Sequence, residues 1–498
     1  MFSKILIANR GEIAVRVIRA CREMGIESVA IYSEADARAL HTTLADAAVR
    51  VGPAPAAGSY LSIQAVLDAA RASGAQAVHP GYGFLSENAE FAAACADAGI
   101  TFIGPSPQAM ALVGSKTTAR DVAARAGVPV IPGEAPADQS DDALLAAAAR
   151  VGFPVLLKPS EGGGGIGMKV VLTPDALPDA AAQARRESVA AFGDPTLYVE
   201  RLIARARHVE FQILADHHGH AVHVFERECS IQRRHQKVVE ETPSVALTPT
   251  LRARMGEAAV RIAHAAGYTG AGTVEFLVEG TGDSAAFYFL EVNARLQVEH
   301  PITEEVTGLD LVRAQIGIAA GQPLPWSQAE IGQRGHAIEV RIYAEDPAQG
   351  YLPQAGPVLL YREPSMPGVR VDSGVSQGSE VSVHYDPLLA KLIARGETRD
   401  AARRRALAAL RSFPILGLRT NQALLLRILQ HDRFVRGELD THFLEQEHEA
   451  LANTPAAGRD LARAEAVARA AAKIPRSDAP AASARGADPW ERVTAFRG

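Results

Sequence analysis

The stretch Phe287-Tyr-Phe-Leu-Glu-Val-Asn-Ala-Arg-Leu-Gln-Val-Glu-His-Pro-Ile-Thr303 joins an apolar, aromatic strand to a dense group of charged and amide side chains. Successive side chains of a strand point to opposite faces, which places Phe287, Phe289, Glu291 and Asn293 on one expected face. Further polar side chains follow directly after the strand, namely Arg295, Gln297, Glu299 and His300. This crowding predicts a functional site at the end of the strand.

A second strand is expected just upstream, over residues 273–278, with a polar, glycine-containing turn between the two strands. If this hairpin folds about Asp283, Glu275 lies directly opposite Glu291. Two carboxylates and the amide oxygen of Asn293 are ligands that a hard cation such as Mg²⁺ prefers. The two glutamates alone would fit solvated acids on a hairpin face equally well, and the polar residues that follow favour a site.

The composition bounds the class of protein. A chain of 498 residues is expected to form about two to four domains, and 47% hydrophobic residues are typical of a soluble globular protein. The net charge of −6 argues against a nucleic acid or a membrane surface as the main partner. No apolar run is long enough to cross a bilayer, and we expect no signal peptide. Three cysteines without disulfide or metal-type spacing fit a reducing cytoplasm: Cys21, Cys95 and Cys229.

The amino-terminal segment predicts a parallel, doubly wound sheet. Strands are expected at residues 4–8 and 28–32 with a helix between them, and this order is typical of such sheets. The glycine pattern of a dinucleotide-binding loop is missing. The later loop at residues 79–88 fits simple turn chemistry, with Ser86 or Asn88 as the cap of the next helix.

A glycine-rich loop, Glu161 to Met168, follows a strand that ends at Lys158. Glycine lets backbone N–H groups approach phosphate oxygens closely, and the lysine adds a positive charge. A glycine run is a flexible linker as often as a phosphate loop, but the strands on both sides favour a loop over a ligand. It is not a Walker motif, because no Gly-Lys-Ser/Thr ends it. Lys116 opens another helix, where a lysine by itself is usually solvated.

Other segments also carry polar residues at strand spacing. The strand at 208–214 has one polar face, which exposure to solvent would explain equally well. A basic run at 229–237 follows an expected strand at 220–225 and fits either a solvated face or a contact with an anion. The strand at 335–345 carries Arg341 beside acidic and aromatic neighbours, which is typical of a structural ion pair.

Several segments, in order along the chain, resemble the motifs of a biotin carboxylase of the ATP-grasp superfamily: residues 8–14, 79–88, 162–168, 232–238 and 291–303. The resemblance extends from residue 1 to about residue 446. It implies an α/β and α+β chain with the ATP-grasp fold, in which a doubly wound parallel-sheet domain precedes a mobile lid and an antiparallel-sheet domain. The implied divisions are the N-terminal domain at 1–113, linker and lid at 114–204, catalytic core at 205–330, C-terminal domain at 331–447 and an Ala/Pro-rich tail at 448–498.

The resemblance implies a reaction in two steps. ATP phosphorylates bicarbonate to carboxyphosphate, and the carboxyl group then passes to N1′ of biotin on a carrier. The positions that match ATP contacts of the family are Lys116, Lys158, Gly163, Gly164, Gly165, Glu200, Leu202, His208, Gln232, His235, Glu275 and Leu277. Those that match ligands of Mg²⁺ or Mn²⁺ are Glu275, Glu291 and Asn293.

The same resemblance implies the reaction centre. The positions that match the bicarbonate and biotin pocket are Lys237, Arg295, Gln297, Val298, Glu299 and Arg341. Glu299 matches the general base that takes the proton of bicarbonate. Arg341 matches the residue that stabilises the enolate oxygen of biotin, and Arg295 supplies planar recognition of a carboxylate-like ion. Lys237 completes the implied catalytic set.

One segment departs from the family pattern. Most members carry Lys or Arg where this chain has Ile166, and glycine is common where it has Glu161. A lid tip with one cation fewer and one acid more is expected to hold phosphates less well.

The segment at 368–374 and the closing residues at 488–497 resemble acyl-CoA carboxylase alpha subunits of the propionyl or methylcrotonyl type. Those chains continue into a transferase-contacting domain and a biotinyl domain with a Met-Lys-Met motif, which this sequence lacks. We therefore expect the sequence to stop a few residues into the next domain. The implied partners are a biotin carboxyl carrier domain and a carboxyltransferase beta subunit, and members of the family differ in whether they form homo-oligomers.

Two other functions fit part of the pattern. Another ATP-grasp ligase, joining a carboxylate to an amine, would share Lys116, Lys158, Glu275 and Glu291 but would not need the reaction-centre set. A non-catalytic subunit could bind nucleotide or dock a partner without turnover. The retained reaction-centre residues argue against this last function, and Ile166 gives it slight support.

Overall fold

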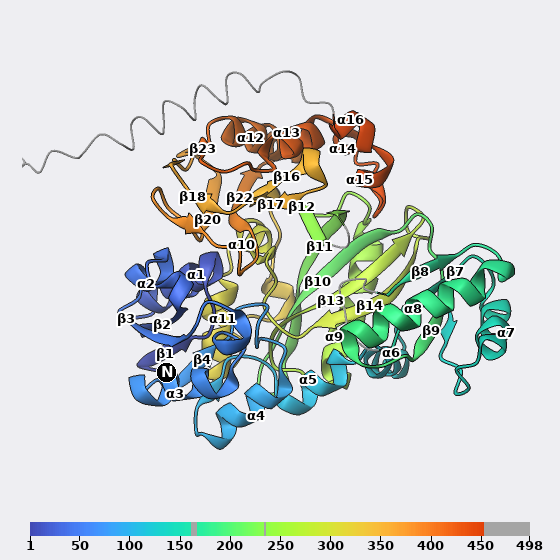
Figure 1. Ribbon diagram of the computed structural model, residues 1–498, viewed down its shortest axis with the longest axis horizontal. Coiled ribbons are helices and arrows are strands. Elements are labelled where there is room, and N and C mark those ends of the chain that lie inside the picture. Colours follow the sequence, from blue (N-terminus) through green and yellow to red (C-terminus); the bar gives the residue numbers. More distant parts are fainter. Residues whose placement is uncertain (161–166, 234–235, 453–498) are drawn as a thin grey trace, which may run out of the picture. The chain divides into compact units, whose positions relative to one another are not determined.

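The computed structural model describes residues 1–160, 167–233 and 236–452 (Figure 1). Some predicted positions lie outside these ranges. They are Glu161, Gly163, Gly164, Gly165 and Ile166 of the glycine loop, the predicted ATP contact His235, and residues 453–498 of the tail. Within the described ranges, no helix combines the length and the apolar character that crossing a bilayer requires.

The amino-terminal part folds into the expected parallel sheet. Its strand order is β3-β2-β1-β4-β5, and each neighbouring pair is parallel. The strands are β1 (Lys4–Ile7), β2 (Glu27–Ser33), β3 (Ala47–Gly52), β4 (Ala77–His79) and β5 (Thr101–Phe102). Helix α1 (Gly11–Glu23) joins β1 to β2. Helix α4 (Ala89–Asp97) begins after Asn88, whose side chain accepts a hydrogen bond from the N–H of Phe91 at 2.7 Å, so the predicted Asn88 cap is confirmed.

A small antiparallel sheet follows, with the order β6-β9-β7-β8. Its strands are β6 (Gly133–Glu134), β7 (Val155–Pro159), β8 (Lys169–Val171) and β9 (Leu197–Arg201). Helices α7 (Asp141–Val151) and α8 (Leu177–Phe192) bury apolar side chains against it and form a separate small core. β7 pairs antiparallel with β9, with Leu156 opposite Glu200 and Lys158 opposite Tyr198, so Lys158 and Glu200 are diagonal neighbours on one face of this sheet.

The largest sheet has eight strands in the order β14-β13-β10-β11-β12-β15-β22-β20, and all of its pairs are antiparallel. These strands are β10 (Arg207–Ala215), β11 (Ala221–Arg233), β12 (Gln236–Thr242), β13 (Gly270–Glu279), β14 (Ala286–Asn293), β15 (His336–Tyr343), β20 (Val369–Ser373) and β22 (Leu388–Gly396). Helix α9 (Pro249–Ala265) packs on β10 and β11, and α12 (Arg399–Arg411) packs on β22 (Figure 1). β12 lies before residue 330 and β15 lies after it, and the two strands pair. One sheet therefore contains strands from both of the implied segments 205–330 and 331–447.

The opening hairpin is formed by β13 and β14, and Glu275 lies opposite Glu291 as predicted. The expectation that Phe287 and Phe289 share a face with Glu291 is wrong, because both phenylalanines belong to the buried core. Phe276 pairs with Phe289, so the register shifts by one residue on β14 between these two pairs. Such a bulge turns the strand, and the phenylalanine faces the core while the glutamate faces the site.

Two further expectations are corrected. The polar face of β10 is not solvated, because His208, Glu210 and Gln212 are all buried. The strand predicted at 220–225 does not end before the basic run, because β11 continues to Arg233. The polar side chains of β10 are covered by other parts of the protein, so they must find partners inside it: Arg227 contacts Glu210 and Gln212, and Gln232 contacts His208.

Candidate active site

Lys237, near the start of β12, is the centre of the site. Its Nζ lies 2.9 Å from Glu275 Oε1 and 2.7 Å from Glu299 Oε1, and it also pairs with Glu210. Burial disfavours the charged lysine, but these three carboxylates outweigh it and raise the pKa of Lys237 well above its usual value. One ammonium group therefore joins an acid of the hairpin to the acid that precedes helix α10 (His300–Thr307).

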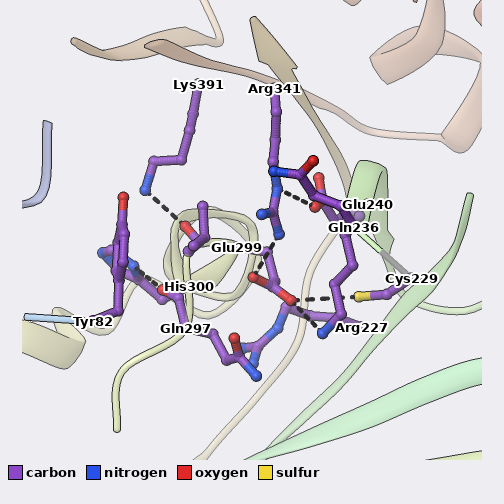
Figure 2. A network of polar contacts seen from close by, with 12 residues as sticks. Tyr82, Arg227, Cys229, Gln236, Glu240, Gln297, Glu299, His300, Arg341 and Lys391 are labelled. Atoms are coloured by element: carbon purple, nitrogen blue, oxygen red, sulfur yellow. Dashed lines mark hydrogen bonds and ion pairs between the residues drawn. The ribbon is translucent and has the colours of Figure 1, made fainter. Parts of the chain in front are cut away.

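Glu299 forms ion pairs with two cations of the large sheet, Lys237 and Arg341. Figure 2 shows the contact between Glu299 and Arg341. One carboxylate oxygen contacts Lys237, and the other accepts a hydrogen bond from Arg341 Nη2 at 3.0 Å. Arg341 is held in turn by Glu240, which accepts from its Nε at 2.6 Å. Burial raises the pKa of Glu299, but Lys237 and Arg341 outweigh it and hold that pKa well below the usual range. Glu299 is therefore ionised, as a proton acceptor must be.

Glu275 accepts contacts from several directions. His208 Nε2 lies 2.7 Å from one carboxylate oxygen, and Asn293 Nδ2 donates to the other at 2.9 Å. Burial raises the pKa of Glu275, but Lys237 and His208 outweigh it and lower that pKa. Burial, and then the charge of Glu275, raise the pKa of Glu291. The charge of His208 favours the ionised form of both acids, and Lys116 and Lys158 add to it at Glu291, but burial outweighs these cations at Glu291.

Arg295 is anchored by the loop after β4. Its Nε lies 2.9 Å from one oxygen of Glu87, and the other oxygen accepts from the N–H of Ala294 at 2.8 Å. Arg295 also donates to Asn293 Oδ1 at 2.8 Å and to Gln297 Oε1 at 2.9 Å. The interpretation of that loop as turn chemistry alone is therefore wrong, because it supplies an acid that orients a predicted site residue.

Two lysines predicted to hold phosphates come from different elements, Lys158 from the small sheet and Lys116 from a helix that packs on β14. Lys158 Nζ lies 2.9 Å from Glu200 Oε2, which joins two of the predicted ATP positions. Lys116 is the first residue of helix α6 (Lys116–Arg125). Its positive charge partly offsets the effect of burial on the pKa of Glu291. The structure therefore gathers Lys116 with the predicted metal ligands.

The remaining predicted nucleotide contacts lie along neighbouring strands. Gln232 Nε2 hydrogen-bonds His208 Nδ1, so these two positions on β10 and β11 meet. Leu202 directly follows β9, and its N–H donates to the carbonyl of Pro154 at 3.0 Å. Leu277 lies on β13 and packs in a small apolar cluster.

Several buried polar residues of the site belong to no recognised motif. They are Glu210, Arg227, Cys229, Glu240 and Lys391, of which Figure 2 labels Arg227, Cys229, Glu240 and Lys391. Arg227 is fully buried and pairs with Glu210, and Cys229 Sγ lies 3.8 Å from Glu299 Oε1. A signal for them existed in the sequence, because a charged residue inside an apolar strand must find a partner in the interior.

The donor set fits a magnesium ion. Glu275 and Glu291 face each other across the hairpin, and Asn293 adds an amide oxygen from the same strand. These are hard oxygen ligands of the kind that Mg²⁺ takes. A divalent cation between them would also favour the ionised form of Glu291, whose pKa is raised by burial and by the charge of Glu275.

Comparison with known proteins identifies the family. Family models match residues 1–110 (biotin carboxylase, N-terminal domain), 115–327 (carbamoyl-phosphate synthase L chain, ATP binding domain) and 339–446 (biotin carboxylase C-terminal domain). The biotin carboxylase of Halalkalibacterium halodurans is 50% identical over 444 residues, which are 89% of this chain and 97% of that protein. This chain belongs to the biotin carboxylase family. Its fold is the ATP-grasp fold, as the sequence predicted.

Relatives of this biotin carboxylase family member belong to different carboxylases. The mitochondrial methylcrotonoyl-CoA carboxylase subunit alpha of Rattus norvegicus is 49% identical over 453 residues, which are 91% of this chain but 63% of that subunit. The biotin carboxylase domain dimer of Hydrogenobacter thermophilus 2-oxoglutarate carboxylase, in complex with MgADP, ADP and bicarbonate, superposes with a TM-score of 0.87 at 43% identity, covering 91% of this chain and 100% of that one. The comparisons support biotin carboxylase activity, an ATP-dependent ligase reaction, and the family uses ATP, magnesium and biotin.

Proposed function

We propose that this chain carboxylates biotin on a biotin carboxyl carrier, using ATP and bicarbonate, as the first half-reaction of an acyl-CoA carboxylase. The observation that carries the proposal is the placement of Glu299 between Lys237 and Arg341, with the ammonium of Lys237 also on Glu275. A proton acceptor, a bicarbonate-binding cation and a metal-binding acid thereby lie within one connected group. An amine ligase would not need this combination.

In the proposed first step, Glu299 takes the proton of bicarbonate as a bicarbonate oxygen attacks the γ-phosphorus of ATP. The bond from that phosphorus to the β-phosphate bridging oxygen breaks, and ADP and carboxyphosphate form. Lys237 and Arg295 hold the anion, with Gln297 and the backbone of Val298 completing its pocket. The lowered pKa of Glu299 keeps it ionised until the proton arrives.

Magnesium, held by Glu275, Glu291 and Asn293, would offset the negative charge of the phosphates during this transfer. Around it, this chain supplies further positive charge of its own. We propose that Lys116, Lys158 and His208 bind phosphate oxygens, with Gln232, Glu200, Leu202 and Leu277 around the rest of the nucleotide. The proposed contacts of Gly163, Gly164, Gly165 and His235 rest on the family resemblance alone.

In the proposed second step, the bond between the carboxyl carbon and the phosphate oxygen of carboxyphosphate breaks, the departing phosphate takes the N1′ proton of biotin, and the carboxyl carbon bonds to N1′. The ureido ring carries negative charge on its oxygen when N1′ loses its proton. Arg341 would stabilise that oxygen, because its guanidinium already contacts Glu299 and is fixed by Glu240. Both steps then share one small region.

We propose a biotin carboxyl carrier domain and a carboxyltransferase beta subunit as partners. The chain spans about 63% of the length of the methylcrotonoyl-CoA carboxylase alpha subunit that it matches, and that name supports an acyl-CoA carboxylase. A dimer is known for the Hydrogenobacter biotin carboxylase domain, which supports testing this chain for self-association. A cytoplasmic location also stays a proposal, since the rat relative is named mitochondrial.

The test is ADP release, measured with and without bicarbonate and free biotin. We expect release that requires bicarbonate and rises with biotin. An amine ligase would ignore biotin, and a docking subunit would release no ADP. The second assay supplies a biotinylated carrier domain with ¹⁴C-bicarbonate, and label on the carrier is the expected product.

A further inference from the structure

We propose that Lys391 is a positioning residue that fixes the Val298–Glu299 peptide for the proton transfer from bicarbonate, and that Glu12 and Tyr82 hold its ammonium in place. This inference rests on the proposed function. Lys391 lies on β22, and its side chain is fully buried. Figure 2 shows that side chain pointing toward the loop that carries Glu299.

The first argument is the register of the large sheet. Lys391 lies directly opposite Arg341 on the neighbouring strand, so both side chains are on one face. The guanidinium of Arg341 contacts the carboxylate of Glu299, and Lys391 Nζ donates to the carbonyl of Val298 at 2.7 Å. Two opposing strand positions therefore hold the side chain of Glu299 and the backbone that leads into it.

The second argument is the geometry of the peptide group. The carbonyl of Val298 and the N–H of Glu299 share one plane, so a hydrogen bond that fixes the first also fixes the second. Glu299 occupies the N-cap position of α10, yet its side chain makes no cap hydrogen bond. Its backbone therefore depends on contacts outside the helix. His300 Nδ1 contacts the carbonyl of Gln297 at 2.8 Å and holds the preceding turn.

The third argument is the choice of partners for a buried charge. Lys391 Nζ lies 3.1 Å from Glu12 Oε1, which belongs to the first turn of α1, and the hydroxyl of Tyr82 donates to the same oxygen. Asp372 lies opposite Lys391 on β20, but both of its oxygens are taken by Arg370. The ammonium therefore joins the amino-terminal sheet domain to the catalytic turn.

The energetic cost makes a purely space-filling role a poor explanation. Removing an ammonium and a carboxylate from water carries a large desolvation penalty, and apolar side chains of similar size fill such space without that penalty. The ion pair does something that an apolar pair cannot, since it donates a directed hydrogen bond to one chosen carbonyl. That carbonyl precedes the proposed general base.

The experiment compares Lys391→Met, Lys391→Arg and Glu12→Gln with wild type in the bicarbonate-dependent, biotin-stimulated ADP release assay. We expect Lys391→Met to lower kcat about 100-fold, as a misplaced catalytic group does, with the KM for ATP changed by less than about twofold. Lys391→Arg should recover about a tenth or more of the activity, because it can still donate to the carbonyl. The kcat of Glu12→Gln should lie between those of wild type and Lys391→Met, because the amide still accepts a hydrogen bond from Lys391 but carries no negative charge.

Matched measurements separate the possible outcomes. Lys4→Met, which removes a partly exposed ion pair with Glu27, should leave kcat unchanged. If Lys391→Met and Lys391→Arg lose activity, ATP affinity and melting temperature in parallel, the residue is structural and the proposal is overturned. An unchanged kcat in Lys391→Met also overturns it. If Lys391→Met does not fold, Lys391→Arg and Glu12→Gln replace it. A lowered kcat with little change in the KM for ATP then supports the proposal, and an unchanged kcat or a parallel loss of ATP affinity overturns it. Failure of the proposed function would show separately, as wild type releasing no ADP in response to bicarbonate and biotin.

Discussion

The carboxylate of Glu299 and the guanidinium of Arg341 are 42 residues apart in the chain and lie 3.0 Å apart in the structure. Glu299 belongs to the turn before α10, whereas Arg341 belongs to β15 of the large sheet. In the proposed reaction, one receives the proton of bicarbonate and the other stabilises the oxygen of biotin. Because the two side chains touch, a substitution of either residue should affect both proposed steps.

Glu299→Gln should lower kcat about 100-fold or more, with little change in the KM for ATP, because the amide cannot accept the proton. Glu299→Asp is the matched control for charge and should keep more activity. The sign of the pH effect follows from the lowered pKa of Glu299: the group stays ionised until the pH falls below the range where a free glutamate titrates, about pH 4.3. Protonation of Glu299 should therefore not limit kcat/KM of wild type between about pH 6 and 8. A Glu299→Gln variant with wild-type kcat would remove the general base from the mechanism.

Arg341→Lys should lower biotin-stimulated ADP release about 100-fold despite keeping the charge. The guanidinium contacts Glu240 through Nε and Glu299 through Nη2, and an ammonium cannot reproduce this planar pair of bonds. Arg436→Lys, at an exposed ion pair with Glu438, is the control and should behave as wild type. Equal activity in Arg341→Lys and wild type would contradict the proposed oxyanion role.

Glu291→Gln should raise the Mg²⁺ concentration needed for half-maximal activity at least about tenfold, since it removes a proposed ligand. The metal-free protein should not melt earlier, because burial and the charge of Glu275 already disfavour an ionised Glu291. Activity at varied Mg²⁺ concentration measures the metal requirement, and thermal unfolding with and without Mg²⁺ measures the stability of the metal-free and metal-bound protein. Glu279→Gln, on the same hairpin and paired with Arg201, is the control. A loss of stability without any change in the Mg²⁺ requirement would argue against this site.

Ile166→Arg should lower the KM for ATP, because it restores a cation that most family members carry in the lid loop. This prediction rests on sequence alone, since Ile166 lies outside the described residues. Leu172→Arg adds the same charge at an exposed position after β8 and is the matched control. An unchanged or raised KM for ATP in Ile166→Arg would show that the loop charge does not govern ATP affinity.

Glu241→Gln should destabilise the protein at neutral pH and much less in acid. Burial raises the pKa of Glu241, but the contacts of His336 and Arg399 outweigh it and lower that pKa to about 2. A carboxylate with a lowered pKa stabilises the fold above its unfolded pKa of about 4.3, and this contribution is lost as the pH falls toward about 2. The expected loss at pH 7 is on the order of 3 kcal/mol in the free energy of unfolding.

Urea unfolding of wild type and Glu241→Gln near pH 7 and near pH 3 measures this difference. Glu438→Gln is the control, because that carboxylate is exposed and its variant should match wild type at both pH values. A destabilisation by Glu241→Gln that is as large near pH 3 as near pH 7 would exclude the ion pairs as its cause.

The alternation of side chains along single strands predicted most elements of the fold and the pairing of Glu275 with Glu291. The elements were predictable because a strand has a period of two residues. Glu291 lies opposite Glu275, however, only because a bulge adds one residue to the register that pairs Glu279 with Ala286 and Phe276 with Phe289. The same rule failed at Phe289, because one extra residue in a bulge reverses which face a side chain occupies. The local sequence pattern does not indicate where the bulge occurs, so the face that Phe289 occupies is known only from its packing against the core.

By itself, the sequence determined the fold class and named the residues whose types suit phosphate, magnesium and bicarbonate. Only the tertiary structure decided that Glu87 orients Arg295, that Arg227 pairs with Glu210, and that Lys391 reaches the carbonyl of Val298. These partners come from strands and loops far apart in the chain, and their meeting depends on how the eight-stranded sheet is assembled. Periodicity specifies which face of its own strand a side chain occupies, whereas the identity of a buried charge's partner is set by the packing of distant elements.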